Sequence, residues 1–283
     1  MLNRKWGSAK LKTKINLNLF PYLIWMAIFV IVPLFLVFVF AFTNPSGGFT
    51  FENIMYVGKY SSVFLRSIVL GIISTIICLL LGYPMAYCIS KVKIKYQSVL
   101  IMLMMIPMWT SFLLRTYAWM TILEYNGLLN KLLAFMGFSK INMINTPGAI
   151  ILGMVYNFLP YMILPIYTVL AKIDKRVIEA AQDLGANGIK VFLKVIFPLS
   201  IPGVVSGFTM VFVPSVSTFI ISKMLGGGSI LVIGDLIEMQ FLGNAYNPYL
   251  GSAISLVLMV IILICMGIMN QIDSNSNSEK LAV

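Results

Sequence analysis

The chain has 283 residues, of which 60% are hydrophobic and only 10% are charged, and its mean hydropathy is +0.96. A soluble domain of this length has too little interior to bury so much apolar surface, so the composition excludes an ordinary soluble fold. Histidine is absent, which excludes acid–base catalysis and metal binding by that residue type.

Six mostly apolar segments follow one another along the chain, each long enough to cross a bilayer as a helix of about 20 residues. Continuous apolarity favours helices, because the strands of a membrane barrel would alternate apolar and polar residues. We predict membrane helices over residues 20–42, 62–90, 98–123, 147–171, 195–222 and 248–269. The expected fold is therefore an all-α polytopic membrane protein with six transmembrane helices.

The first segment is too long for the apolar region of a signal peptide, and no small-x-small cleavage pattern follows it, so we expect a retained anchor. The predicted organisation has a basic tail over residues 1–19 and then a first helix with its outer loop over 20–61. A transmembrane domain of five spans over 62–270 and a short tail over 271–283 complete the chain.

Basic residues predict the orientation of the helices. Fourteen of the 20 lie in the two tails, the second–third connection and the fourth–fifth connection: Arg4, Lys5, Lys10, Lys12, Lys14, Lys91, Lys93, Lys95, Lys172, Lys175, Arg176, Lys190, Lys194 and Lys280. Cytoplasmic loops are enriched in Lys and Arg, so we expect these connections and both termini in the cytoplasm. The net charge of +11 is mostly this topological signal, and its scatter over separate short loops speaks against nucleic-acid binding.

A polar stretch over residues 172–194 interrupts the apolar pattern. Asp174 is suited to cap a short helix over 175–184, and Gly185 is suited to the left-handed conformation that ends such a helix. Asn187 can cap a second helix that runs toward Pro198. The stretch is predicted to be a helix lying across the membrane surface.

Small and acidic residues suit the first of these helices to docking. Ala180 and Ala181 carry no bulk, so a partner's backbone can approach closely, and Glu179 and Asp183 lie on one face because they are four residues apart. These features favour a helix that fits a groove on another protein. A solvated amphipathic linker is the alternative.

The sequence EAAQDLG, followed by nine residues and then VIFP, resembles the cytoplasmic EAA loop of ABC-importer permease subunits. In that family Glu-Ala-Ala is followed by three residues, Gly, nine residues and Ile-x-Leu-Pro; here Val195 and Phe197 replace the usual Ile and Leu. The resemblance implies a coupling helix that seats in a cleft of an ATPase subunit. The residues to which it assigns this role are Glu179, Ala180, Ala181, Asp183, Gly185 and Pro198.

Further stretches resemble the permeases of spermidine/putrescine importers: LGYPMAYCISK at 81–91, IPMWTSFLLRTYAWM at 106–120, NGLLN at 126–130 and IGDLIEMQF at 233–241. The resemblance implies the type I importer (MetI-like) permease fold in a bacterial cytoplasmic membrane. It also implies a second homologous permease subunit, two ATPase subunits and an extracytoplasmic substrate-binding protein as partners. The chain has no P-loop, so we expect a non-catalytic subunit that binds no cofactor, with ATP hydrolysed by the partner.

A polyamine is a flexible polycation, which carboxylates and aromatic faces would bind. Asp235 and Glu238 are spaced i,i+3 in a predicted outer loop, and Glu124 lies at the outer end of the third span. Solvated loop charges, or docking of the binding protein, are the alternatives for these carboxylates. Trp109 is a further candidate for the substrate path, and packing against a neighbouring helix is its alternative.

Other classes of protein fit less well. A secondary transporter needs coupling-ion groups at mid-membrane depth, and the predicted spans contain almost no carboxylates. The polar constellation of a membrane enzyme is missing, and Cys78, Cys88 and Cys265 lack the spacing of a metal site. A permease for another small solute, such as an anion, a phosphonate or a metal ion, stays open as the alternative.

Overall fold

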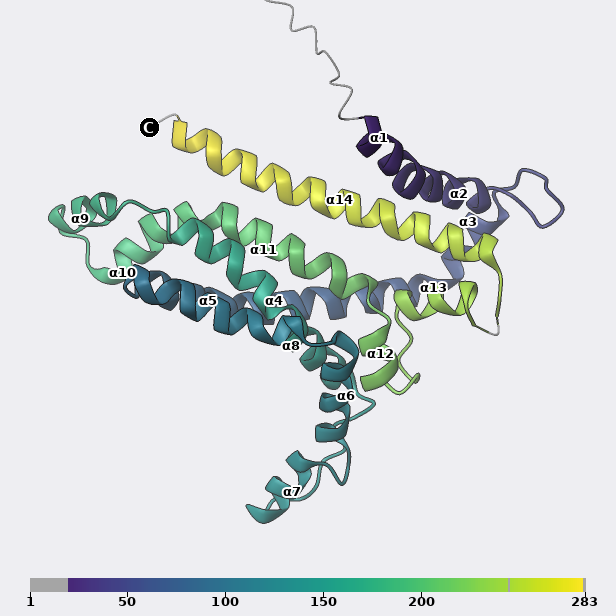
Figure 1. Ribbon diagram of the computed structural model, residues 1–283, viewed down its shortest axis with the longest axis horizontal. Helices are drawn as coiled ribbons and strands as arrows, with labels where there is room; N and C mark the ends of the chain where they lie inside the picture. The colour runs from purple at the N-terminus through teal and green to yellow at the C-terminus, as the bar shows by residue number, and fades with distance from the viewer. Residues whose placement is uncertain (1–19, 244, 282–283) are drawn as a thin grey trace, which may run out of the picture.

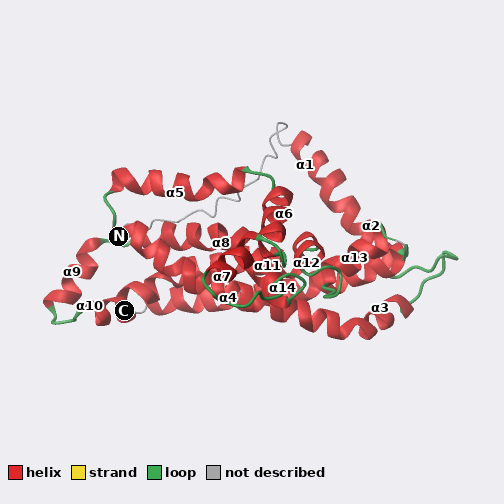
Figure 2. Ribbon diagram, turned by 90° about the horizontal axis from the view of Figure 1, so that it is seen from below, coloured by secondary structure: helices red, strands yellow, loops and turns green. Residues whose placement is uncertain are grey.

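The computed structural model describes residues 20–243 and 245–281. Most of these residues are helical (Figure 2), with one isolated antiparallel bridge between Thr43 and Phe49. The α-helices are α1 (Phe20–Met26), α2 (Val32–Ala41), α3 (Glu52–Val57), α4 (Ser61–Lys91), α5 (Ile94–Trp109), α6 (Phe112–Leu123), α7 (Leu128–Phe135), α8 (Pro147–Leu170), α9 (Lys175–Asp183), α10 (Gly188–Val191), α11 (Phe197–Ser217), α12 (Ile220–Leu225), α13 (Ile233–Phe241) and α14 (Pro248–Leu281).

The long helices α4, α8, α11 and α14 run side by side as an elongated bundle (Figure 1). One end of the bundle carries α9, α10 and the connection between α4 and α5, while the other end carries α3, α12 and α13. The two internal connections that the sequence predicts to share one side of the membrane therefore lie at the same end.

Five helical stretches are long and apolar enough to cross a membrane: Pro21–Ala41, Glu52–Lys91, Pro147–Leu170, Gly188–Ser217 and Pro248–Gln271. A sixth crossing is obtained only when the bent pair Ile94–Trp109 and Phe112–Phe135 is taken as one span. The polytopic α-helical architecture is confirmed. The number of spans is six if the bent pair is counted as one span and five if it is not.

The third predicted span, over residues 98–123, is wrong as a single helix. The chain breaks at Thr110 and Ser111, and the segments on either side differ in direction by 84°. Pro107 has no N–H for the helix, and both the N–H and the hydroxyl of Thr110 donate to the Pro107 carbonyl, at 3.3 and 2.7 Å. Pro107, Thr110 and Ser111 mark the break in the sequence, but the surrounding segment is apolar enough for hydropathy alone to treat it as one span.

The fifth predicted span, over residues 195–222, is shifted. The helix begins at Gly188, passes through a π-helical turn over Phe192–Ile196, and ends at Ser217; α12 is a separate helix. A similar turn over Ala27–Ile31 precedes Pro33 in the first span. In both places a wider turn comes just before a proline that cannot donate to the helix.

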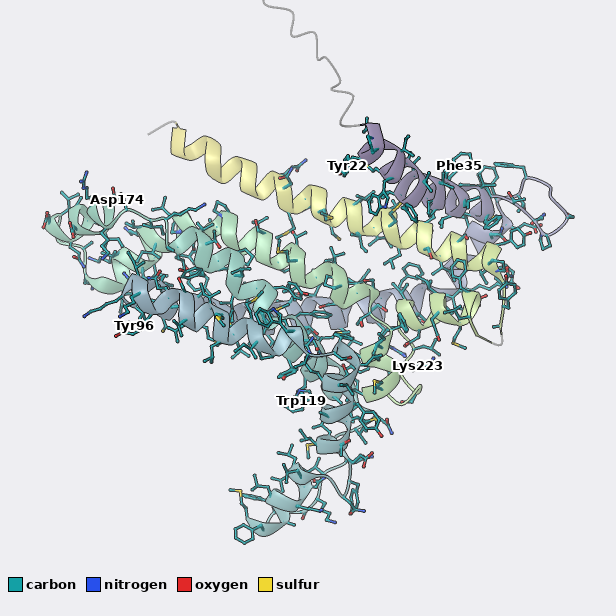
Figure 3. All side chains as sticks on the ribbon, in the orientation of Figure 1. Tyr22, Phe35, Tyr96, Trp119, Asp174 and Lys223 are labelled. Atoms are coloured by element: carbon teal, nitrogen blue, oxygen red, sulfur yellow. The ribbon has the colours of Figure 1, made fainter. Side chains whose placement is uncertain are left out.

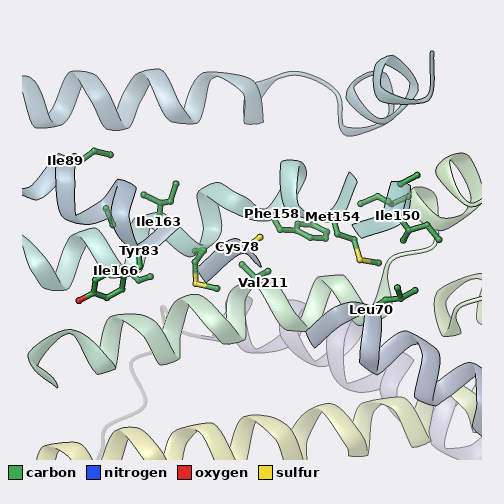
Figure 4. Packing of buried hydrophobic residues seen from close by; sticks show 14 of the residues in the cluster. Leu70, Cys78, Tyr83, Ile89, Ile150, Met154, Phe158, Ile163, Ile166 and Val211 are labelled. Carbon is green, nitrogen blue, oxygen red and sulfur yellow. The ribbon is translucent and has the colours of Figure 1, made fainter. Parts of the chain in front are cut away.

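The core lies where α8 packs between α4 and α11 (Figure 4). Tyr83 and Cys78 of α4, Phe158 of α8 and Val211 of α11 belong to this cluster. At Gly203 of α11 a Cβ atom would lie 2.9 Å from a backbone oxygen of α8, so only glycine permits this helix spacing. A second cluster joins α2 and α14 to α13 and to the ends of α4 and α11 that lie farthest from α9.

Candidate functional site

The loop over residues 172–194 is built from two capped helices, as predicted. Asp174 Oδ1 accepts a hydrogen bond of 3.0 Å from the Arg176 N–H at the start of α9, and Asn187 Oδ1 accepts one of 2.9 Å from the Lys190 N–H at the start of α10. Both side chains satisfy donors that the first turn of a helix leaves unpaired. The loop is therefore a shaped element with defined ends.

Gly185 ends α9 in the left-handed conformation, with φ of +81°, as predicted. The Gly185 N–H donates to the Gln182 carbonyl at 2.8 Å, and the Ala186 N–H donates to the Ala181 carbonyl at 3.1 Å. This pair of hydrogen bonds is a Schellman motif, which turns the chain sharply at the end of a helix. No atom lies within 4 Å of a Cβ built at Gly185, so the backbone angle alone demands glycine.

The solvent-facing side of α9 carries Glu179, Ala180 and Asp183, all of which are exposed. Ala181 differs from the prediction, because it is half-buried and packs against the hydrophobic core. Ala180 is therefore the more accessible of the two alanines, and Ala181 lies at the edge of α9 that faces the bundle. Beside the exposed face, the apolar side chain of Leu184 is 90% exposed.

The far end of the loop is joined to the bundle through aromatic rings. Phe192 makes edge-on contacts with Tyr83 and Tyr87 of α4, at centroid distances of 5.8 and 5.5 Å. The Tyr83 hydroxyl lies 2.8 Å from Ser200 Oγ, two residues after the half-buried Pro198. The end of the loop therefore contacts α4 and also continues into α11.

Gln97 joins α5 to the same end of the bundle, and sequence reasoning missed it. Its Nε2 donates to the carbonyls of Ser90 and Val92 at 3.1 and 2.8 Å, and its Oε1 accepts from the Tyr167 hydroxyl of α8 at 2.9 Å. Gln97 is also the one buried residue of α5. A polar residue at the edge of an apolar segment was the only available signal.

The opposite end of the bundle holds Asp235 and Glu238 on one helix, α13, as their spacing predicted. Both line a pocket of about 290 Å³ together with Lys223, and Lys223 Nζ forms an ion pair of 2.9 Å with Glu238 Oε1. Figure 3 shows Lys223 toward this end of the bundle and Asp174 at the other. The pocket is thus lined by charges of both signs.

Asp235 is not a solvated loop charge, since its side chain is buried. Its Oδ1 accepts from the Ser222 hydroxyl at 2.9 Å, and its Oδ2 accepts from the Val232 N–H at 3.1 Å, which caps α13. Burial raises the pKa of Asp235, an effect that these two hydrogen bonds oppose. Asp235 therefore has a structural role whether or not it also meets a substrate.

Trp109 and Glu124 do not line this pocket. Trp109 ends α5 at the break and is 76% exposed, so it does not pack within the bundle. The exposed Glu124 ends α6, where its main-chain carbonyl accepts from the Asn130 side chain at 3.3 Å. The four residues predicted for the substrate path are thus divided between separate surfaces.

The cysteines occupy unlike positions: Cys78 is buried, Cys265 is half-buried and Cys88 is exposed. Among the side chains that the structure describes, at residues 21–243 and 245–271, no three Cys, Asp or Glu side chains gather as a metal ion would require.

Comparison with known proteins bears on the whole chain. Residues 79–276 match the family described as binding-protein-dependent transport system inner membrane component. Over 247 residues the chain is 39% identical to the spermidine/putrescine transport system permease protein PotB of Haemophilus influenzae, covering 84% of this chain and 86% of the relative. It is 34% identical to the protein of the same name from Escherichia coli, with 84% and 90% covered.

A solved structure of a bacterial ABC transporter involved in the import of the acidic polysaccharide alginate has a chain that superposes with a TM-score of 0.77. The match covers 91% of this chain and 94% of the other at 17% identity. At that identity the likeness shows a shared fold.

Proposed function

The chain belongs to the family of binding-protein-dependent transport system inner membrane components, and from this premise we propose that it is the permease subunit of a polyamine importer. It is a multi-pass membrane protein of the bacterial inner membrane, and the resemblance of its sequence to ABC-importer permeases is confirmed. ATP is hydrolysed by a separate subunit of such a system, so this chain has a non-catalytic role.

The observation that carries the proposed substrate is the 39% identity, over 84% of the chain, to a permease named for spermidine and putrescine. Asp235 and Glu238, the acidic residues of the pocket that they share with Lys223, are compatible with a cationic substrate. Glu238 is paired with Lys223 and Asp235 is buried, so a polyamine amine would displace the lysine in order to reach Glu238. Trp109, whose ring is exposed, is a further candidate for contact with an amine.

Coupling to the ATPase is proposed for the exposed face of α9. Glu179, Ala180 and Asp183 are exposed there, the Gly185 turn directs the helix, and Leu184 offers an apolar anchor. Apolar anchors surrounded by polar residues are the usual centre of a protein–protein contact. Ala181 and Pro198 would act indirectly, by holding the helix against the bundle.

The proposed assembly pairs this chain with a second homologous permease, two ATPase subunits and an extracytoplasmic binding protein. The family description supports the last of these, since it names binding-protein-dependent transport. The end of the bundle that carries α9 would face the cytoplasm, because Lys91, Lys93 and Lys175 lie there.

Orientation has a direct test. In a chain whose native cysteines are replaced by alanine, Asn187→Cys should not react with a membrane-impermeant thiol reagent added to intact cells. Ser46→Cys, in the exposed loop after the first span, should react and serves as the control. Labelling of Asn187→Cys alone would reverse the proposed topology.

The substrate is tested by uptake into vesicles that contain the chain with its partner subunits. Labelled spermidine and putrescine should accumulate only when ATP and the binding protein are supplied. Phosphonates, inorganic anions and metal ions serve as competitors, since a permease for another small solute is the alternative. ATP-driven uptake of one of those solutes, with no accumulation of either polyamine, would overturn the proposal.

A further inference from the structure

A cavity of about 450 Å³ lies beside the coupling loop, where α4, α5, α8 and α9 meet. Lys91, Lys93 and Lys175 line it from three segments of the chain, together with the polar side chains of Ser90 and Gln97. Its lining residues include no Asp or Glu. A concave site with three ammonium groups and no carboxylate is suited to an anion.

The lysines are not drawn away by other contacts. Within the described part of the chain the one ion pair is formed at the opposite end, by Lys223 and Glu238. Lys91 Nζ lies 5.2 Å from the centre of the Tyr87 ring, which holds that ammonium group beside the cavity. The positive charge of the cavity is therefore available to a ligand.

An apolar groove continues from this cavity along the membrane-spanning part of α4 and α5. It also measures about 450 Å³, shares Val92 with the basic cavity, and is lined by Met85, Cys88, Ile89, Val92, Leu100, Leu103 and Met104. Leu103 remains 64% exposed, and α5 stands apart from the bundle when seen from below (Figure 2). The groove is shaped for a hydrocarbon chain.

We propose that these two cavities form one binding site for an anionic phospholipid. The headgroup phosphate would contact Lys91, Lys93 and Lys175, and an acyl chain would lie between α4 and α5. An amphiphile is the occupant that matches both halves of the site: a free phosphate leaves the groove unused, and a neutral lipid leaves the lysines unpaired. The inner leaflet of a membrane supplies anionic headgroups at this depth.

The site also reaches the coupling helix. Lys175 begins α9 and Ile178 lies one turn later, and both line the basic cavity. A bound headgroup therefore links the start of α9 to the end of α4 and stabilises the position of the helix proposed to meet the ATPase.

The test reconstitutes the complete importer in vesicles of phosphatidylcholine with a minor fraction of phosphatidylglycerol, and measures the lipids that copurify by native mass spectrometry. Phosphatidylglycerol should be enriched over its share of the vesicle. Replacing Lys91, Lys93 and Lys175 together by glutamine should reduce this enrichment by well over tenfold, since each lysine contributes about fivefold at an anionic lipid surface. The matched control replaces Lys172, Lys190 and Lys194 by glutamine, on the same loop but outside the cavity, and should retain the lipid.

The groove is tested separately. Leu103→Trp should fill it and lower the retained phosphatidylglycerol, while Leu114→Trp, at an exposed leucine of α6 outside the groove, should not. Equal loss in the two lysine triples would overturn the proposal in favour of unspecific attraction. A different result would indicate a phosphate site instead of a lipid site: inorganic phosphate displaces the lipid, and Leu103→Trp has no effect on the lipid retained. Loss of the ATPase or of the second permease from the cavity variants, with unchanged lipid, would identify a subunit interface and also overturn it.

Discussion

The Tyr167 hydroxyl of α8 donates a 2.9 Å hydrogen bond to Gln97 Oε1, and this contact joins α5 to the bundle beside the loop over residues 172–194. Gln97 in turn holds the carbonyls that end α4, so one side chain links three helices. In Figure 2 α5 stands apart from the bundle, and Gln97 near its start is its one buried residue.

Gln97→Leu should destabilise the protein by about 1–3 kcal/mol, since it leaves buried polar groups without partners. Tyr167→Phe removes a single hydrogen bond and should cost about 0.5–1.5 kcal/mol. Thermal unfolding of the detergent-purified chain measures both changes, and Gln271→Leu at an exposed position of α14 is the control. Faster hydrogen exchange over residues 92–100 is expected in Gln97→Leu; unchanged exchange there would contradict the proposed link.

Gly185→Val should misdirect α9 while leaving the membrane helices inserted. A β-branched residue at φ of +81° is strained by roughly 1–2 kcal/mol, although the site offers space for the side chain. Copurification of the ATPase and polyamine uptake should both fall. Gly188→Val, in the same loop and also with open space but without the left-handed angle, should keep both activities.

Gly185→Asn provides a second arm, because asparagine tolerates the left-handed conformation better than other non-glycine residues. Its copurification of ATPase should lie between that of the parent and that of Gly185→Val. If the valine variant assembles and transports at the parental rate, the loop is a linker rather than a coupling element.

Leu184→Asp should weaken attachment of the ATPase about tenfold or more, because burial of a leucine at an interface contributes about 1.5–3 kcal/mol. Glu179→Lys should also weaken attachment of the ATPase, because it reverses a charge on the exposed face of the same helix. The control is Leu242→Asp, which alters an equally exposed leucine at the opposite end of the bundle. Titration of the purified ATPase onto vesicles measures the affinities, and equal weakening by all three variants would exclude α9 as the docking helix.

Asp235→Ala should lower stability by about 0.5–2 kcal/mol through loss of the cap on α13. Glu238→Gln breaks an ion pair whose lysine is 60% exposed, so its effect on stability should be below about 1 kcal/mol. Polyamine uptake separates the roles further: Glu238→Gln should raise the half-saturating concentration if Glu238 meets the substrate. An unchanged concentration in that variant would remove Glu238 from the path.

The stability contribution of Asp235 should also depend on pH. Its pKa is raised in the folded protein, so the fold favours the neutral carboxyl relative to the unfolded chain, whose pKa is about 3.9. That contribution is complete below the unfolded pKa and is lost as the pH rises through the folded pKa. As the pH rises from about 4 to the folded pKa, the melting temperature of the parent should therefore fall relative to that of Asp235→Asn. If the melting temperature of the parent instead rises relative to that of the variant over this range, the raised pKa is contradicted.

The sequence by itself determined the class of the protein and the parts that depend on local chemistry. Uninterrupted apolar segments predict membrane helices because a bilayer leaves no other partner for the backbone. The caps at Asp174 and Asn187 and the turn at Gly185 were predictable because each is made by a side chain or backbone angle within a few residues. The family resemblance rested on the same short loop.

Only the tertiary structure decided which polar groups meet. The break after Trp109 lies at Thr110 and Ser111, within a segment whose average hydropathy still passes as one span, so hydropathy did not reveal it. Gln97 became a link between helices through a contact with Tyr167, 70 positions away, and Asp235 gained a partner in Ser222, 13 positions away. Ala180 and Ala181 were separated because one faces solvent and the other faces the core. Burial depends on what packs against a helix, and no local pattern carries that information.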